Sequence, residues 1–220
     1  MLGRKRQDYT GEFVILEKKI SGGVTEEKRQ WISNPIENHH ISGRAAVIGS
    51  RLDQSRFRHQ RLQTHKGGLL ATKRLQTYGT GDLWTDMTFD FYVTTDRESI
   101  NKLSEIKYDQ RSTVYTSARI CIENPGRFYP VPYLPVIDDL ALNVYLAAFD
   151  GHQEIFLIGY NNDTPHGKSS WMYDIFRVIN AYPTTKFTLV GRKTNMPDMW
   201  RQCKNVNCMD FREFVFYCDV

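Results

Sequence analysis

The amino-acid sequence predicts an α/β protein with a Rossmann-like, mostly parallel sheet and helices on both faces. The first observation is the order of elements: from residue 138 onward the apolar segments read helix, strand, helix, strand. The second is their pattern, because strands that are continuous apolar runs are typical of parallel strands buried on both faces. The third is a run rich in Leu and Ala after Asp138, too long and too well capped to be a strand. It excludes an all-β fold.

The chain length indicates one large domain with an appendage. Its 220 residues are little more than one typical domain, so we expect an N-terminal extension at residues 1–40, packed on an α/β domain at residues 41–220. No segment approaches the roughly 18 apolar residues that span a bilayer, and the start of the chain lacks the apolar stretch of a secretory signal. We therefore expect a cytoplasmic protein with no membrane span and with its four cysteines as reduced thiols.

The first half of the chain contains four predicted strands. Glu12–Glu17 is a short apolar run of strand length within the N-terminal extension, and Arg44–Gly49 is the first strand of the main domain. Thr88–Thr95 alternates apolar and polar residues, and Thr113–Ile122 is rich in β-branched and aromatic residues. Between the second and third of these, the Gly-rich segment Tyr78–Trp84 is interpreted as a turn with a buried Trp84.

The second half begins with a loop and a capped helix. Asn124–Pro135 holds four of the eight prolines, so we expect an extended loop. The helix that follows begins after Asp138, a typical N-cap, and closes at Asp150 and Gly151, a typical C-terminal signal. The remaining expected elements are a strand at Glu154–Tyr160, a helix at Ser170–Ala181, a strand at Lys186–Val190 and a helical turn at Asp198–Gln202.

Ligands of open parallel sheets bind at the carboxyl ends of the strands, near the point where the strand order reverses, and this rule selects the loops that matter. After the first strand of the domain, Gly49 allows close approach of backbone, Ser50 can donate a hydroxyl hydrogen bond and Arg51 can grip a phosphate. Neither GxGxxG nor a Walker A motif occurs, which argues against classical dinucleotide binding and P-loop hydrolysis. Asp96 ends another strand, where it either contacts a ribose hydroxyl or, the favoured interpretation, caps the next helix.

The polar loop after Tyr160 is the second candidate region. His166 titrates near neutrality and can act as a general base, Asp163 can orient it or bind a sugar hydroxyl, and Asn161 can contact substrate. The alternative is an ordinary surface loop in which Asn and Asp form turns. We also place Asp138, at the end of the proline-rich loop, among the substrate-binding residues. No DxD pair occurs, so the sequence offers no metal-ligand set of the usual kind and we expect no cofactor.

The charge of the chain is unevenly distributed. Lys and Arg number 29 and Asp and Glu 25, a formal charge of +4, but the stretch from Arg51 to Arg74 holds seven basic residues and one acid. This basic stretch carries +6 and leaves −2 for the rest of the chain, so the protein is a nearly neutral globule with one positive segment.

Three segments resemble parts of the sialyltransferase-like glycosyltransferases. LALNVYLAAFDG followed by HQEIFLIGYNND, within Ile137–Asp163, is similar to the late half of that group, and AVIGS and VTTD stand where it places earlier strands. The similarity covers about residues 44–190 and is one of pattern; Gly49-Ser50-Arg51 stands where the family usually has Asn-Gly-Pro-Ser. The resemblance implies a GT-A-like Rossmann variant that transfers a sugar from a nucleotide donor to an acceptor hydroxyl without metal, with a loop histidine as base.

The sequence is compatible with two functions from different classes of protein. The first is a small glycosyltransferase that binds a nucleotide-sugar donor and an unknown acceptor. The second is a non-catalytic structural or binding protein, a viral one included, that holds nucleic acid or a partner through the basic stretch. A relative that keeps the fold and has lost the chemistry would show the same pattern.

Overall fold

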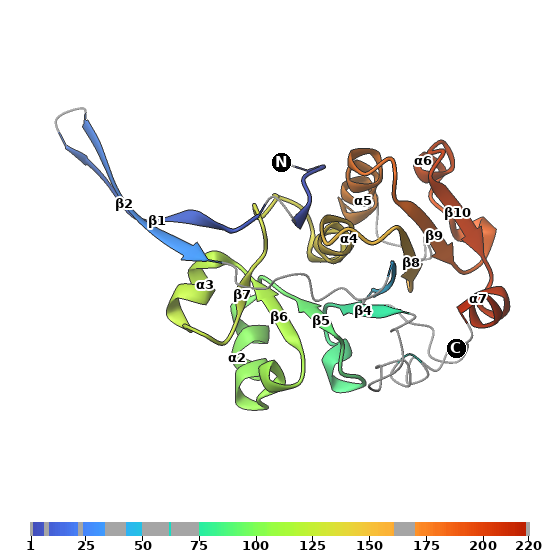
Figure 1. Ribbon diagram of the computed structural model, residues 1–220, viewed down its shortest axis with the longest axis horizontal. Coiled ribbons are helices and arrows are strands. Elements are labelled where there is room, and N and C mark those ends of the chain that lie inside the picture. The colour runs from blue at the N-terminus through green and yellow to red at the C-terminus, as the bar shows by residue number, and fades with distance from the viewer. Residues whose placement is uncertain are drawn as a thin grey trace.

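A computed structural model describes residues 2–6, 9–21, 24–33, 43–49, 62, 75–160 and 170–218. Within these residues the main sheet has eight strands, all paired in parallel, in the order β10-β9-β8-β3-β4-β5-β6-β7 (Figure 1). The strands are β3 (Arg44–Ile48), β4 (Gln76–Gly79), β5 (Phe91–Val93), β6 (Thr113–Thr116), β7 (Tyr129–Pro130), β8 (Glu154–Ile158), β9 (Lys186–Val190) and β10 (Val206–Met209). The predicted parallel α/β architecture is confirmed.

Helices cover both faces of this sheet, as expected. The helices are α2 (Arg97–Glu105), α3 (Ala118–Glu123), α4 (Asp139–Phe149), α5 (Ser170–Ala181), α6 (Asp198–Arg201) and α7 (Phe211–Cys218), with short 3₁₀ turns η2 (Leu83–Thr85), η3 (Tyr108–Gln110) and η4 (Lys193–Asn195). In Figure 1, α4 and α5 lie on one face and α2, α3 and α7 on the other. The sheet is therefore the middle of three layers.

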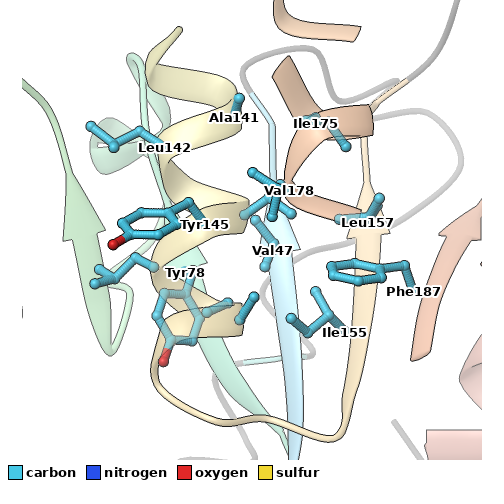
Figure 2. Close-up of a cluster of buried hydrophobic side chains, with 14 of the residues drawn as sticks. Val47, Tyr78, Ala141, Leu142, Tyr145, Ile155, Leu157, Ile175, Val178 and Phe187 are labelled. Carbon is cyan, nitrogen blue, oxygen red and sulfur yellow. The ribbon is translucent and has the colours of Figure 1, made fainter. Parts of the chain in front are cut away.

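The alternation of side chains along each strand divides the core in two. Val47 and Leu157 point to the α4 and α5 face, where Figure 2 shows them packed with Tyr145 and Val178. Their neighbour Ile48 belongs to the second cluster, which includes residues of α2 and α7. Because both faces are buried, β3 and β8 are apolar after their first residues, Arg44 and Glu154.

Helix α4 is the central helix of the first face. Nine of its residues, from Ala141 to Phe149, are buried. Asp138 accepts a hydrogen bond from the Leu140 N–H at 2.9 Å, and Gly151 beyond the helix has a φ of +93°, the left-handed conformation that favours glycine. The predicted caps of this helix are confirmed.

Three expectations differ from the structure. The predicted strand Thr113–Ile122 ends at Thr116, because Ser117 caps α3 through the Ile120 N–H. The proline-rich loop contains β7, a two-residue edge strand where proline is tolerated. The Gly-rich segment contains the second half of β4, Tyr78 and Gly79, and the buried residue of the turn after it is Leu83, with Trp84 only partly buried.

The N-terminal residues contact the main domain and then leave it. Arg6 and Tyr9 are buried, and the following strands β1 (Gly11–Ser21) and β2 (Val24–Ser33) form an antiparallel hairpin that projects away from the body (Figure 1). The expected boundary between residues 40 and 41 lies outside the described residues, so the division into extension and domain stays a prediction.

Arg6 belongs to a buried polar cluster beneath α4. Its guanidinium forms an ion pair with Asp150 and donates to the Tyr115 hydroxyl at 3.0 Å. Tyr78 donates to the second Asp150 oxygen at 2.7 Å, and its hydroxyl lies 2.8 Å from Nε2 of His152. This cluster joins the start of the chain to the end of α4 and to two strands of the sheet.

In the described residues no helix is both long enough and apolar enough to cross a membrane. The four cysteines have no disulfide partner, as expected.

Candidate functional site

The strand order reverses between β3 and β8. From β3 the chain adds β4, β5, β6 and β7 on one side, and β8, β9 and β10 extend the sheet on the other. In doubly wound sheets ligands bind at the carboxyl ends of the two strands that flank such a reversal. A ligand is therefore expected to bind beside the residues that follow Ile48 and Ile158.

Gly49 and Gly159 lie against each other at this point. The Gly49 N–H donates to the Ile158 carbonyl at 2.9 Å, which extends the pairing of β3 and β8 by one residue. A Cβ on Gly49 would lie 3.2 Å from the Gly159 oxygen and 3.4 Å from the Tyr160 ring. The glycine therefore permits a close approach between the protein's own strands, and the predicted approach of Gly49 to a ligand stays a prediction.

Tyr160 closes one side of the junction. Its hydroxyl donates to the Leu140 carbonyl at 3.1 Å in the first turn of α4. Burial raises the pKa of Tyr160, and a hydrogen bond from Asn143 opposes this only in part, so the side chain is a neutral phenol near pH 7. Tyr160 thus holds the end of β8 against the start of α4.

Asn143 is a polar residue within an otherwise apolar helix. Its side chain is fully buried, and its Nδ2 donates to the Ile48 carbonyl at 3.4 Å. Its Oδ1 has no hydrogen-bond partner among the described residues. A buried acceptor without a partner is uncommon. Because Asn143 also bonds the last residue of β3, this acceptor lies at the carboxyl end of that strand.

The first turn of α4 is acidic and tied to the sheet. Thr95, after β5, donates its hydroxyl to Asp139 at 2.8 Å and its N–H at 3.2 Å. The Asp138 N–H donates to Asp174 of α5 at 3.1 Å. Both carboxylates of this turn, Asp138 and Asp139, are half-buried. They provide acceptors suited to the hydroxyls of a ribose or another sugar.

Asp96 follows Thr95 at the same edge. Its carboxylate accepts the Ser99 N–H at 2.7 Å and caps α2, so the favoured interpretation of this residue as a helix cap is confirmed. This hydrogen bond lowers the pKa of Asp96, and the side chain is exposed. The substrate-binding roles assigned to Gly49, Asp96 and Asp138 stay predictions, and the structure gathers these residues along one edge of the sheet.

Several candidates lie outside the described residues. These are Ser50, Arg51, Asn161, Asp163, His166 and the basic stretch 51–74 apart from Leu62. The described residues that precede Ser50 and Asn161 in the chain, Gly49 and Tyr160, lie side by side. In the described part of the chain, no group of three or more His, Cys, Asp or Glu side chains could hold a metal ion.

Four residues of this junction were not predicted from the sequence: Asn143, Thr95, Asp139 and Tyr160. Asn143 carried a signal, because an amide in a run of Leu, Ala, Val and Tyr breaks the apolar pattern of a buried helix. The pairings of Thr95 with Asp139 and of Tyr160 with Leu140 carried none, since each joins segments 20 or more residues apart.

The described residues thus define a doubly wound parallel α/β protein, with an N-terminal hairpin and with an acidic helix start at its reversal point. No protein-family model and no curated protein matches the chain. The fold is similar to a solved structure of the sialyltransferase CstII from Campylobacter jejuni in complex with a substrate analogue, cytidine-5'-monophosphate. The TM-score is 0.44 at 8% sequence identity, over 70% of this chain and 80% of that one.

Proposed function

We propose that this chain binds a nucleotide sugar where β3, β8 and α4 meet and transfers the sugar to an acceptor hydroxyl without a metal ion. The observation that supports binding there is the contact between Gly49 and Gly159 at the reversal of the strand order. The glycines let the ends of β3 and β8 pack closely at the edge where ligands of doubly wound sheets bind. The half-buried carboxylates of Asp138 and Asp139 are the acceptors for sugar or ribose hydroxyls.

The proposed chemistry assigns His166 as the general base. Its imidazole accepts the proton of the acceptor hydroxyl while the acceptor oxygen forms a bond to the anomeric carbon of the donor. The bond from that carbon to the phosphate oxygen breaks, and the nucleotide leaves with the electron pair and the negative charge. Arg51 and neighbouring cations stabilise this charge through guanidinium hydrogen bonds, and Asp163 orients the histidine.

Binding is tested by thermal unfolding with nucleoside monophosphates, diphosphates and nucleotide sugars, each with EDTA present. A donor at one hundred times its Kd should raise the melting temperature by about 5–10 °C. Gly49→Ala should weaken the effective nucleotide about tenfold, because its Cβ pushes against Gly159. Gly43→Ala is the matched control at the other end of β3, where the nearest atom to a new Cβ is 3.8 Å away. No response to any nucleotide would refute the proposal.

Turnover is tested by mixing the stabilising donor with a panel of sugar and hydroxylated acceptors. His166→Ala should abolish transfer and leave the donor-induced thermal shift intact, whereas His39→Ala should leave both unchanged. Donor binding without transfer by any acceptor would support a binding protein that keeps the fold. Nucleic-acid binding through residues 51–74 is the competing function from the sequence, and it predicts an affinity that falls steeply with salt.

A further inference from the structure

The hairpin of β1 and β2, called the arm below, is attached to the body mainly at its base. There the Glu12 carboxylate accepts the Tyr133 N–H at 3.1 Å. Beyond the base the arm projects away from the sheet and helices (Figure 1). A two-stranded hairpin on its own is marginally stable in water, so the arm gains from any surface that covers it.

The two faces of the arm differ in composition. Residues paired across the two strands share a face, and a bulge between Ile15 and Glu17 resets the alternation. One face, called the outer face, carries from base to tip the pairs Phe13 with Trp31, Ile15 with Arg29, Lys18 with Glu27, and Ile20 with Thr25. The outer face is therefore apolar at both ends and charged near its middle.

The apolar side chains of the outer face are unusually exposed. Phe13 is 65% exposed, Ile15 50%, Ile20 73% and Trp31 46%. Phe13 and Trp31 pack edge to face with ring centroids 4.9 Å apart, which builds one aromatic patch near the base. Four large apolar residues gathered on one exposed face are typical of an interaction surface.

The edges of the arm are poor sites for another strand. Lys18 and Lys19 lie on β1, Lys28 lies on β2, and the bulge at Leu16 interrupts the ladder of β1. Lysines and bulges at sheet edges discourage edge-to-edge pairing. A partner of the arm is thus expected to pack on the outer face and not to extend the hairpin.

We propose that the partner is a second copy of this chain, with the two outer faces packed on each other and the two arms antiparallel about a two-fold axis. The pattern of the face is self-complementary in this arrangement. The aromatic patch of Phe13 and Trp31 meets Ile20 of the second copy, and each Arg29 meets the second copy's Glu27. An isologous interface of this kind is the commonest way in which a soluble chain associates with itself.

The charges of the arm favour this occupant. Residues 11–33 contain four acidic and four basic side chains, so two arms bring no net charge together. Within one chain Arg29 already binds Glu27 at 2.6 Å, and Lys18 lies 3.6 Å from the same carboxylate. In the antiparallel pair each Glu27 sits between cations of both copies, which matches opposite charges across the interface.

The size of the face sets the expected affinity. Ten strand residues span about 33 Å and two paired strands are about 10 Å wide, so the face covers roughly 330 Å². This face is smaller than the roughly 800 Å² per partner of a standard stable interface, so we expect a dissociation constant on the order of 10 μM. The dimer should therefore form and dissociate within the concentration range of sedimentation equilibrium.

The first test measures the mass of the full chain by sedimentation equilibrium from about 1 to about 500 μM, a range that brackets the expected Kd. The double variant Phe13→Ser with Trp31→Ser should raise the Kd at least about 30-fold. Phe216→Ser is the matched control, since Phe216 is 90% exposed on α7 and lies outside the arm. A monomer at every concentration, or a dimer that survives the double variant, would overturn the proposal.

The second test depends on charge and leaves the apolar residues in place. Glu27→Arg alone and Arg29→Glu alone each put like charges opposite one another in a homodimer, so each should sediment as a monomer. An equimolar mixture of the two variants restores both pairs of opposite charges and should sediment as a dimer. Failure of the mixture to associate, with wild type dimeric, would refute the antiparallel arrangement.

Discussion

Arg6 anchors the N-terminus through a buried ion pair, and replacing it tests this part of the fold. The Arg6 side chain is 5% exposed and its partner Asp150 is fully buried. Burial alone would lower the pKa of Arg6, but the Asp150 carboxylate outweighs it and the pKa is raised. Arg6→Met keeps much of the apolar stem and leaves the Asp150 carboxylate inside the protein without its cation.

The expected loss of stability is large. Removing one partner of a buried pair costs about 3–5 kcal/mol, because the remaining charge is uncompensated. For a chain of this size each kcal/mol lowers the melting temperature by about 2–4 °C, so Arg6→Met should melt about 6–20 °C below wild type.

The assay is urea and thermal unfolding of four proteins: wild type, Arg6→Met, Asp150→Asn and the double variant. Because the double variant has no buried charge to compensate, it should be more stable than the sum of the single losses predicts, by at least about 1 kcal/mol. Arg4→Met is the control from the same segment, since Arg4 is exposed and its guanidinium lies 4.6 Å from the centroid of the Tyr133 ring. Additive losses, or a melting point for Arg6→Met within about 2 °C of wild type, would refute the reasoning.

Three further predictions concern the core, an ion pair and a thiol. Gly79→Ala should cost about 1–3 kcal/mol in urea unfolding, since its Cβ would lie 2.5 Å or less from the Phe89 ring; an unchanged midpoint would contradict this packing. The ion pair with Arg127 lowers the pKa of Asp109. The stability that this pair adds, below about 1 kcal/mol, is therefore present near pH 7 and is lost as the pH falls through the lowered pKa. Asp109→Asn should flatten this acidic part of the plot of urea midpoint against pH. Burial raises the pKa of Cys121 to about 12, so a thiol reagent at pH 8 should modify it only after unfolding, as peptide mapping would show.

The elements that could be predicted from the sequence are those whose signals are local. Helix α4 is marked by Asp138 at its start and Gly151 after its end, and from Leu140 to Phe149 the only charged or amide side chain is that of Asn143. Strand β8 is apolar after Glu154, and β9 is apolar except for Lys186 and Thr188, a pattern that a sheet covered on both faces can bury. In each of these cases local propensity and tertiary environment agree, so either one identifies the element.

The elements that were not predicted are those in which local propensity and tertiary environment conflict. Strand β4 reads Gln-Thr-Tyr-Gly, a poor strand by propensity, and its Gly79 is required because the Phe89 ring occupies the space of a side chain. The segment after Thr116 has strong β propensity and is nevertheless helical, because Ser117 supplies a cap. Such outcomes depend on contacts that a single sequence does not display.

The candidate site also has one part that could be predicted from the sequence and another that could not. Gly49 could be placed from its position at the end of the first strand of the domain. The junction around it is held by Tyr160 with Leu140, Thr95 with Asp139, and Asn143 with Ile48, and each pair joins separate elements of the chain. Strand order decides which of these ends meet, and the position of β8 beside β3 follows only from the whole topology.

The acidic start of α4 also bears on how a nucleotide would be held at this edge. Asp138 already accepts the Leu140 N–H, and Asp138 and Asp139 match the positive end of the helix dipole. A phosphate placed there would meet like charge, so its charge must be balanced by cations from another segment. The basic stretch begins two residues after Gly49, with Arg51, and its net charge is +6. The proposed site therefore assigns hydroxyl recognition to the acidic helix start and phosphate recognition to the basic stretch, which gives the uneven charge of the sequence a role in binding.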